Sequence, residues 1–380
     1  MKINFYEHNI KIKDQKILKK VLKSTYLTSG PICKKVEEKI ANRFLKKKCL
    51  LTSSWTNAVI GILKSLDLKP QDEVIIPNLT FVACANVIEI SGAKIIFADV
   101  DKNTLLLSID DCVKKITKKT KAIMPVHLYG NIFDTEELKK QIKKKTKRKI
   151  YIIEDSAHAF SGANRKNKPI GYYADFAVFS FYATKNITCG EGGAIITDNI
   201  YQLKKVKSIL INGMSQDAQK RFTKGKYNFW DVKKPGLKGN LSDINASLLL
   251  SQINSNEKNN VKKRKKISDY YKKNLKNFVD YPLNSILKFR DYHLFPIGFK
   301  NEKIRNLVLR DLFAKRIPVT INYKAISELK YYKKKYAIKD CRESIKWGDR
   351  TLSLPLHLKL NLNQINFKIK NIKKIILKYY

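Results

Sequence analysis

Three residues at or just beyond the ends of successive apolar segments carry side chains that could together perform covalent chemistry on an amine. Asp155 ends the segment KIYIIED, Ser180 ends ADFAVFS, and Lys185 follows five positions later. A lysine amine can form an imine with an aldehyde, a carboxylate can pair with a protonated pyridine nitrogen, and a hydroxyl can bind a phosphate. These groups are suited to holding pyridoxal 5'-phosphate, with Lys185 as its covalent attachment point.

The three residues belong to a long alternation of strand-like and helix-like segments, from about residue 14 to residue 200. The predicted buried strands are 49–54, 72–78, 94–101, 121–128 and 149–156. Such alternation is typical of an α/β fold with a mostly parallel sheet and helices on both faces. Ligands of these sheets bind beyond the carboxyl ends of the strands, so Ser54, Asp155 and Ser180 can meet in one site.

The pattern changes after residue 200. Residues 212–240 are irregular and rich in aromatic residues and glycine, and long loops of this kind are often functional. A long helix is predicted from about Ser242 towards Leu275, followed by a smaller α/β lobe. We therefore expect a large cofactor-binding domain with an N-terminal arm at 1–245 and a small C-terminal domain at 246–380.

The last predicted helix has one apolar face with lysines opposite. Ile365, Ile369, Ile372 and Ile376 form this face. Such a stripe can contact a membrane surface, but it is more often the inner face of a terminal helix, and we favour that interpretation.

The composition is typical of a globular protein from a reducing compartment. With 380 residues, 43% of them hydrophobic, the chain can bury a large core. Its six cysteines lack paired spacing, which favours reduced thiols in the cytoplasm and argues against a zinc site. No apolar run approaches the roughly 18 residues of a membrane span, and the start MKINFYEHNIKIK has no signal-peptide core.

The formal net charge is +44, from 77 lysines and arginines against 33 acidic residues. A basic surface can bind nucleic acid. The charge is mostly lysine, however, it is spread over the whole chain, and no known nucleic-acid-binding motif accompanies it. We therefore favour a solvated surface without a nucleic-acid partner, part of which can attract an anionic substrate.

Taken singly, each candidate residue has an ordinary explanation. Lys185 is one of many lysines, and Asp155 can cap the next helix. His158 can be a hydrogen-bonded core histidine, and Thr56 can mark a helix start. Their joint arrangement is what favours a cofactor site.

The same segments resemble the DegT-type (DnrJ/StrS-like) nucleotide-sugar aminotransferases, pyridoxal-phosphate enzymes of fold type I, the aspartate aminotransferase fold. The resemblance covers nearly the whole chain and is densest in IIEDSAHAFSG and FSFYATKNITCGEGGAIIT. The other matching segments are YLTSGP, SSWTNAVIGIL, PNLTFVACANVI, PVHLYG, PGLKGNLSDINASLLLSQI and LSLPLHLKL.

The resemblance implies three catalytic residues. Lys185 attaches the cofactor and, once released by the amino donor, moves a proton between the substrate and the cofactor. Asp155 pairs with the pyridine nitrogen, and His158 packs against the cofactor ring or its hydroxyl. Relatives that dehydrate sugars have histidine in place of the lysine, so Lys185 favours transamination.

The resemblance also implies a shell of cofactor-binding residues. Phe81 stacks on the other face of the ring. Ser180, Thr56 and the backbone N–H of Asn57 bind the phosphate at a helix N-terminus. Asn240 reaches the phosphate from the neighbouring subunit, which implies a homodimer.

Three positions depart from the family pattern. Trp55 replaces a small residue in the phosphate turn, and residues 237–239 replace a tyrosine-containing segment before Asn240. Asn322 and Tyr323 stand where relatives often have His-Tyr near the substrate, so no carboxylate-binding role is assigned there.

From these features we expect a cytoplasmic, homodimeric aminotransferase that moves an amino group from L-glutamate to a nucleotide-linked keto-sugar. The segments NITCGEGG and NGMSQDA resemble those of family members that act at C4 of a UDP- or dTDP-linked 4-keto-6-deoxy sugar. That resemblance implies a role in surface polysaccharide, lipopolysaccharide or glycan synthesis. Amination at C3 is one alternative. A non-catalytic scaffold or regulator of the same fold that binds nucleic acid is another.

Overall fold

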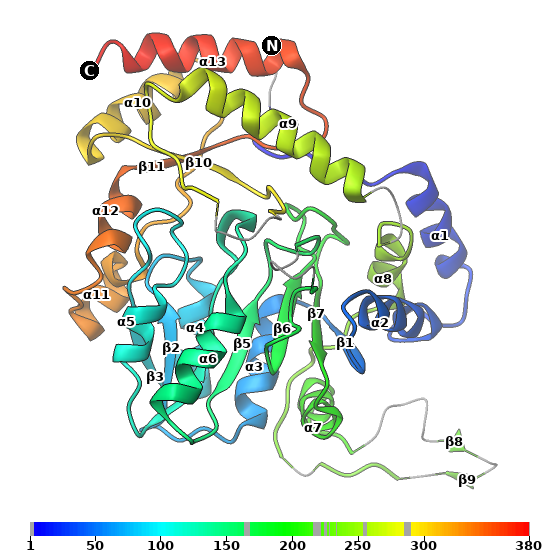
Figure 1. Ribbon diagram of the computed structural model, residues 1–380. Coiled ribbons are helices and arrows are strands. Elements are labelled where there is room, and N and C mark those ends of the chain that lie inside the picture. Colours follow the sequence, from blue (N-terminus) through cyan, green and yellow to red (C-terminus); the bar gives the residue numbers. More distant parts are fainter. Residues whose placement is uncertain are drawn as a thin grey trace.

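A seven-stranded mixed sheet forms the centre of the computed structural model, which describes residues 4–162, 168–215, 222–223, 226–227, 229–232, 234–253, 257–284 and 290–379 (Figure 1). The strand order is β1-β7-β6-β5-β4-β2-β3. All neighbouring pairs from β6 to β3 are parallel, and β7 is antiparallel to both of its neighbours. The strands are β1 (Lys48–Thr52), β2 (Glu73–Pro77), β3 (Lys94–Ala98), β4 (Thr120–Ile123), β5 (Tyr151–Asp155), β6 (Phe176–Ser180) and β7 (Gly193–Thr197).

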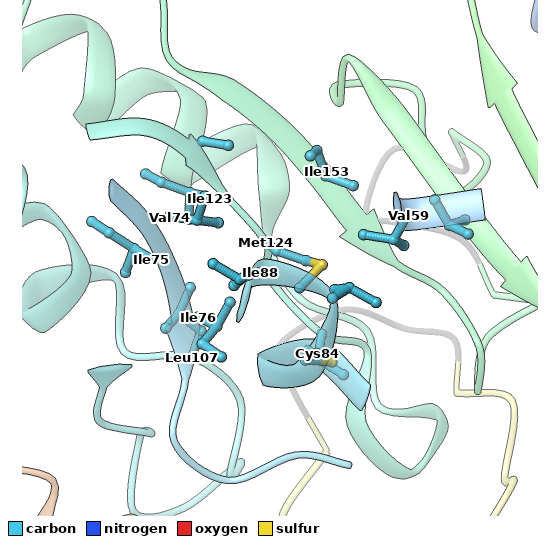
Figure 2. Packing of buried hydrophobic residues seen from close by; sticks show 14 of the residues in the cluster. Val59, Val74, Ile75, Ile76, Cys84, Ile88, Leu107, Ile123, Met124 and Ile153 are labelled. Carbon is cyan, nitrogen blue, oxygen red and sulfur yellow. The ribbon is translucent and has the colours of Figure 1, made fainter. Parts of the chain in front are cut away.

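Helices flank this sheet, so the expected α/β class with a mostly parallel sheet is confirmed. They are α2 (Pro31–Arg43), α3 (Trp55–Ser65), α4 (Ala83–Ser91), α5 (Ile109–Lys114), the short η1 (Leu128–Gly130), α6 (Thr135–Lys145), α7 (Ile200–Leu210) and α8 (Asp243–Leu250). Helix α1 (Ile12–Leu22) packs against α8. Figure 2 shows how β2, β4 and β5 pack against Val59 of α3 and Cys84 and Ile88 of α4. Strand β2 is buried along its whole length, and after Glu73 its sequence is an apolar run, Val74 to Pro77, without alternation.

A second group of elements lies above the sheet in Figure 1 and forms a smaller lobe. It contains the antiparallel pair β10 (Phe295–Gly298) and β11 (Thr351–Leu354), together with α9 (Glu257–Leu275), α10 (Glu302–Ala314) and α13 (Leu362–Ile376). Their apolar side chains make a hydrophobic cluster of their own. Between α10 and β11, the chain forms η3 (Ile326–Glu328), α11 (Lys330–Tyr336) and α12 (Arg342–Arg350).

The division into two lobes does not follow a single point in the sequence. Ile326, Tyr332 and Trp347 come from η3, α11 and α12, yet they join the hydrophobic cluster of the large sheet. Helix α8, which spans residue 245, packs against α1 and α2. The division into domains 1–245 and 246–380 stays a proposal.

The single helix expected from Ser242 towards Leu275 is wrong. Helix α8 ends at Leu250, a turn follows at 251–253, and α9 begins at Glu257. The intervening sequence SQINSN is rich in serine and asparagine, whose side chains compete for backbone hydrogen bonds and favour helix ends.

The apolar stripe of α13 packs inward against α9 and α10, as favoured. One lysine departs from the expected placement opposite the stripe, because Lys368 is fully buried beside the isoleucines. Within the described ranges, no helix is both long and apolar enough to cross a membrane. Of the irregular stretch 212–240, the structure describes only part, including the short strands β8 (Phe222–Thr223) and β9 (Lys226–Tyr227).

Candidate active site

The ends of β5, β6 and β1 and the start of β7 lie at one edge of the sheet. Ser180 at the end of β6 pairs with Gly193 at the start of β7, and Gly193 pairs with Thr52 at the end of β1. Asp155 ends the adjacent strand β5. Because β7 is antiparallel to β6, the glycine-rich turn after Lys185 leads back to this same edge.

Asp155 is a buried carboxylate held by two donors. Its Oδ1 accepts the N–H of Ala157 at 3.0 Å, and its Oδ2 accepts the Cys84 thiol at 3.3 Å. Burial raises the pKa of Asp155, while these two hydrogen bonds and the charge of Lys185 act in the opposite direction. Burial also raises the pKa of Cys84 well above its usual value, so the thiol keeps the proton that it donates.

The preceding carboxylate, Glu154, lies on the other face of β5, as expected for successive strand residues. It accepts hydrogen bonds from the Thr135 hydroxyl at 2.5 Å and the Gly171 N–H at 2.7 Å, and His127 Nε2 lies 3.3 Å away. Burial opposes ionisation, but these three partners outweigh it and lower the pKa of Glu154. Glu154 is therefore a structural carboxylate.

Lys185 lies in the turn that follows β6, where its N–H donates to the Tyr182 carbonyl at 2.9 Å. Burial of the amine lowers the pKa of Lys185 to about 8, although Asp155 and Cys84 act to raise it. An amine with a lowered pKa has a much larger neutral fraction at pH 7 than an ordinary lysine. The side chain can therefore act as a nucleophile and as a proton acceptor.

His158 lies close to this amine in a neutral form. Its Nδ1 accepts the Tyr129 N–H at 3.2 Å, so the ring proton is on Nε2. Burial, and then the charges of Lys185 and His293, lower the pKa of His158 well below its usual value. The His293 ring packs on it with the centroids 4.3 Å apart.

Phe81 and Tyr323 add two further rings to this region. Their centroids lie 5.7 Å apart, and Tyr323 is nearly parallel to His158 at 6.4 Å. Phe81 is 55% exposed although it is large and apolar. The Asn322 carbonyl accepts the Tyr129 hydroxyl at 2.6 Å, which joins the 322–323 segment to the large lobe.

The N-terminus of α3 lies next to Ser180. A Cβ on Gly193 would lie 2.7 Å from the Ser54 carbonyl carbon and from Trp55 N, so only glycine permits this close approach. Ser54 caps α3 by accepting the Asn57 N–H at 3.1 Å. The Asn57 N–H, which we expected to bind phosphate, thus has a partner within the chain, and the partly exposed Thr56 lies one residue before it.

Asn240 does not join this group within its own chain. It forms a bridge with Thr52, and its side-chain N–H donates to Ser29 at 2.6 Å. Asn240 is therefore three strand positions from Ser180 in the row Ser180–Gly193–Thr52–Asn240, which is roughly 14 Å at the usual strand spacing. A contact with the phosphate of a second subunit stays a proposal.

The structure also brings in residues that sequence reasoning missed. Cys84 contacts Asp155, Tyr129 contacts His158, and Asn186 and His293 contact each other beside Lys185. The sequence held weak signals for two of them, since Cys84 lies three residues after Phe81 and Asn186 directly follows the lysine. Among the described residues, no group of acidic, histidine or cysteine side chains could hold a metal ion.

Comparison with known proteins identifies the family. Residues 8–373 match the DegT/DnrJ/EryC1/StrS aminotransferase family. The chain belongs to this family. An uncharacterised protein of Methanocaldococcus jannaschii is 33% identical over 362 residues, which is 93% of this chain and 92% of that protein.

Solved structures agree with this DegT-family assignment. The Streptococcus pneumoniae protein Spr1654, which is named as a sugar aminotransferase, is 28% identical in its PMP form, covers 99% of both chains and has a TM-score of 0.91. It has also been solved in a PLP form. Helicobacter pylori PseC, an aminotransferase involved in pseudoaminic acid biosynthesis, is 26% identical over all of both chains with a TM-score of 0.90. The expected family, fold type I and the cofactor pyridoxal 5'-phosphate are confirmed.

The residues of this chain fit that cofactor. A desolvated amine, a buried carboxylate, flat rings from His158, Phe81 and Tyr323, and a helix N-terminus beside a serine lie at one edge of the sheet. They match the aldehyde, the pyridine nitrogen, the ring and the phosphate in turn.

Proposed function

We propose that this DegT-family enzyme moves an amino group from L-glutamate to a nucleotide-linked keto-sugar, with Lys185 as the attachment point of its cofactor. One observation supports this most strongly: a desolvated lysine amine with a lowered pKa lies within the electrostatic influence of a buried aspartate. An aminotransferase needs both groups, because an amine must be neutral to react and a pyridine nitrogen must stay protonated to draw electrons.

When bound, pyridoxal 5'-phosphate supplies an electron sink for the carbon that loses a proton. Asp155 would hold a proton on the ring nitrogen, and burial strengthens that ion pair. The Nζ of Lys185, once released by the amino donor, would take the proton from the substrate carbon and return it. His158, neutral and packed by neighbouring rings, would orient the cofactor without competing for that proton.

For the phosphate we propose Ser180, Thr56 and the first turn of α3, with Asn240 from a second subunit. Exposed apolar side chains support a homodimer, because Phe81, Tyr182, Tyr26 and Leu27 are all at least 44% exposed in the single chain. Phe81 and Tyr182 belong to the site region itself. Burying such residues between two copies would complete the site and exclude water from it.

For the acceptor we propose a 4-keto-6-deoxy sugar linked to UDP or dTDP, whose product enters polysaccharide, lipopolysaccharide or glycan synthesis in the cytoplasm. The diphosphate is anionic, and a chain with a formal charge of +44 would attract it. The related Spr1654 is named as a sugar aminotransferase, which supports a sugar acceptor.

A two-stage assay tests this function. Protein loaded with pyridoxal 5'-phosphate is first mixed with glutamate and the loss of its visible band is recorded. A panel of UDP- and dTDP-linked 4-keto and 3-keto sugars is then added and the products are read by mass. We expect an amino sugar from a 4-keto member, and none with Lys185→Ala.

A matched control is Lys143→Ala, which removes an exposed lysine on α6. It should keep full turnover. A wild-type protein that binds the cofactor but aminates no sugar in the panel would contradict the substrate proposal. A protein that takes up no cofactor would contradict the enzymatic proposal as a whole.

A further inference from the structure

Residues 291–293 contact residues of the site, although they belong to the segment that leads into the smaller lobe. The Asp291 N–H donates to the Gly130 carbonyl at 2.9 Å, and the His293 N–H donates to the Tyr129 carbonyl at 3.3 Å. Gly130 has φ +82, and a Cβ there would lie 2.9 Å from Tyr292 N. The segment therefore lies directly against the turn that also binds His158.

The side chain of Asn186 joins this segment to the residue next to Lys185. Its Nδ2 donates to the Asp291 carbonyl at 3.0 Å, and its Oδ1 lies 3.3 Å from His293 Nδ1. Because an amide oxygen only accepts, the proton of His293 must be on Nδ1. The Asn186 backbone carbonyl also accepts from Arg264 Nη2 at 3.4 Å.

His293 makes a second contact with its ring. It packs on His158 at a centroid distance of 4.3 Å and an interplanar angle of 32°. His158 is itself fixed by the Tyr129 N–H. The two histidines and Asn186 thus form one connected unit that reaches from the lysine turn to the cofactor-packing ring.

We propose that Asn186 and His293 are positioning residues that hold the Lys185 turn and the His158 ring in register with each other. This inference rests on the proposed attachment of the cofactor to Lys185. On its N-terminal side, the Lys185 backbone is tied by its own N–H to Tyr182. On its C-terminal side, the Asn186 carbonyl accepts from Arg264, and the Asn186 side chain bonds to Asp291 and His293. We call these two side-chain bonds the Asn186 clamp; their loss would loosen the turn that carries Lys185.

Loss of the Asn186 clamp should change the pKa of Lys185 in the cofactor-free protein. Lys185 owes its lowered pKa first to burial. A turn that is released from Asp291 and His293 would let the amine reach water more often, and its pKa would move up towards that of an ordinary lysine. The pH dependence of acylation of Lys185 in the cofactor-free protein, read by peptide mass, reports this directly.

Variants of His293 and Asn186 separate the effect of their mutual hydrogen bond from that of the ring contact between His293 and His158. His293→Gln can still donate an N–H to Asn186, whereas His293→Phe keeps a ring against His158 but donates nothing. Asn186→Ala removes both of its side-chain bonds, and Asn186→Ser serves if that variant folds poorly. His357→Phe, at a buried histidine of the smaller lobe, is the matched control.

For Asn186→Ala and His293→Phe we expect the acylation midpoint of Lys185 to rise from about 8 by one pH unit or more. In loaded enzyme, kcat should fall by about 10- to 100-fold with little change in KM for the acceptor, as for small misplacements of a reacting group. His293→Gln should recover most of both properties. His357→Phe should match the wild type.

Two results would overturn the inference. One is a wild-type midpoint and kcat in both Asn186→Ala and His293→Phe. The other is a His293→Gln variant that is as impaired as His293→Phe, because the hydrogen bond to Asn186 would then not carry the effect. Failure of the wild-type protein to take up pyridoxal 5'-phosphate would instead contradict the proposed function, and the acylation series would still measure the clamp.

Discussion

The thiol of Cys84, on α4, donates a hydrogen bond to Oδ2 of Asp155 at the end of β5, with the two atoms 3.3 Å apart. This contact opposes the effect of burial on the Asp155 pKa. It therefore helps the carboxylate stay ionised, as its proposed pairing with the cofactor nitrogen requires. The remaining Asp155 oxygen is bonded to the Ala157 N–H, so both oxygens have a donor.

Loss of the Cys84 thiol should weaken cofactor binding. We expect Cys84→Ala to lower the affinity for pyridoxal 5'-phosphate by about 3- to 10-fold, the usual worth of one hydrogen bond. Cys84→Ser keeps a donor and should stay within about twofold of the wild type by the same reasoning. An absorbance titration measures both. The control is Cys112→Ala on α5, where another fully buried cysteine is removed.

Loss of charge at the neighbouring carboxylates Asp155 and Glu154 should affect different properties, turnover for Asp155 and stability for Glu154. Asp155→Asn should keep the fold and lower kcat by about 100-fold or more, because the charge opposite the ring nitrogen is lost. Glu154→Gln should keep the kcat of the folded protein but cost about 1–3 kcal/mol of stability, since a buried hydrogen-bonded acceptor is replaced. An Asp155→Asn variant with wild-type turnover would refute the assignment of Asp155.

Glu154→Gln should also differ from the wild type in how its stability against unfolding depends on pH in the acid range. The folded-state pKa of Glu154 is lowered, so its ionised form stabilises the protein above the unfolded-state value and this contribution is lost as pH falls through the folded pKa. Denaturant unfolding at pH 3 to 7 should show a smaller loss of stability on acidification for Glu154→Gln than for the wild type.

Gly193→Ala should specifically damage the phosphate end of the site. Its Cβ would lie 2.7 Å from backbone atoms of Ser54 and Trp55, so the start of α3 must move away from Ser180. We expect the affinity for pyridoxal 5'-phosphate to fall by about tenfold or more. Gly92→Ala is the control, because its φ of +81 gives backbone strain with no atom within 4 Å. Both variants should lose stability, but only the first should lose affinity.

Lys368 should be a source of instability in the smaller lobe. Its amine is fully buried and has no hydrogen-bond partner among the described residues, and burial lowers the pKa of Lys368 to about 7. Lys368→Met should therefore stabilise the protein by about 1–3 kcal/mol near neutral pH. Between pH 7 and the ordinary lysine pKa, the unfolded chain binds the extra proton, so the wild type gains stability as pH rises. The advantage of the methionine variant, measured by denaturant unfolding, should shrink from pH 7 to pH 10; a constant difference would contradict this account.

Residues that lie at or just beyond the end of a strand could be assigned to the site from the sequence alone. Asp155 and Ser180 were placed by their positions at strand ends, and Lys185 by its turn, because parallel strands direct their carboxyl ends to one edge. The local pattern also predicted the helix start near Thr56, and the resemblance to the family added Phe81 as an expected partner of the cofactor ring. The strand ends and the helix start depend on local periodicity and topology alone.

The remaining features depend on contacts between distant parts of the chain. Cys84 and Asp155 are 71 positions apart, and Asn186 and His293 are 107 apart, so no local pattern could pair them. The burial of Lys368 did not follow from the sequence, because the isoleucines alone define the apolar face of its helix. The break between α8 and α9 was missed because apolar periodicity outweighed a short run of serine and asparagine.

The most direct test of the central claim is to trap the cofactor on its lysine. Protein incubated with pyridoxal 5'-phosphate is reduced with borohydride, digested and read by peptide mass. The account predicts a phosphopyridoxyl group on Lys185, a visible band that borohydride bleaches, and neither in Lys185→Ala, while Lys143→Ala behaves like the wild type. A label on another lysine, or none at all under saturating cofactor, would contradict it.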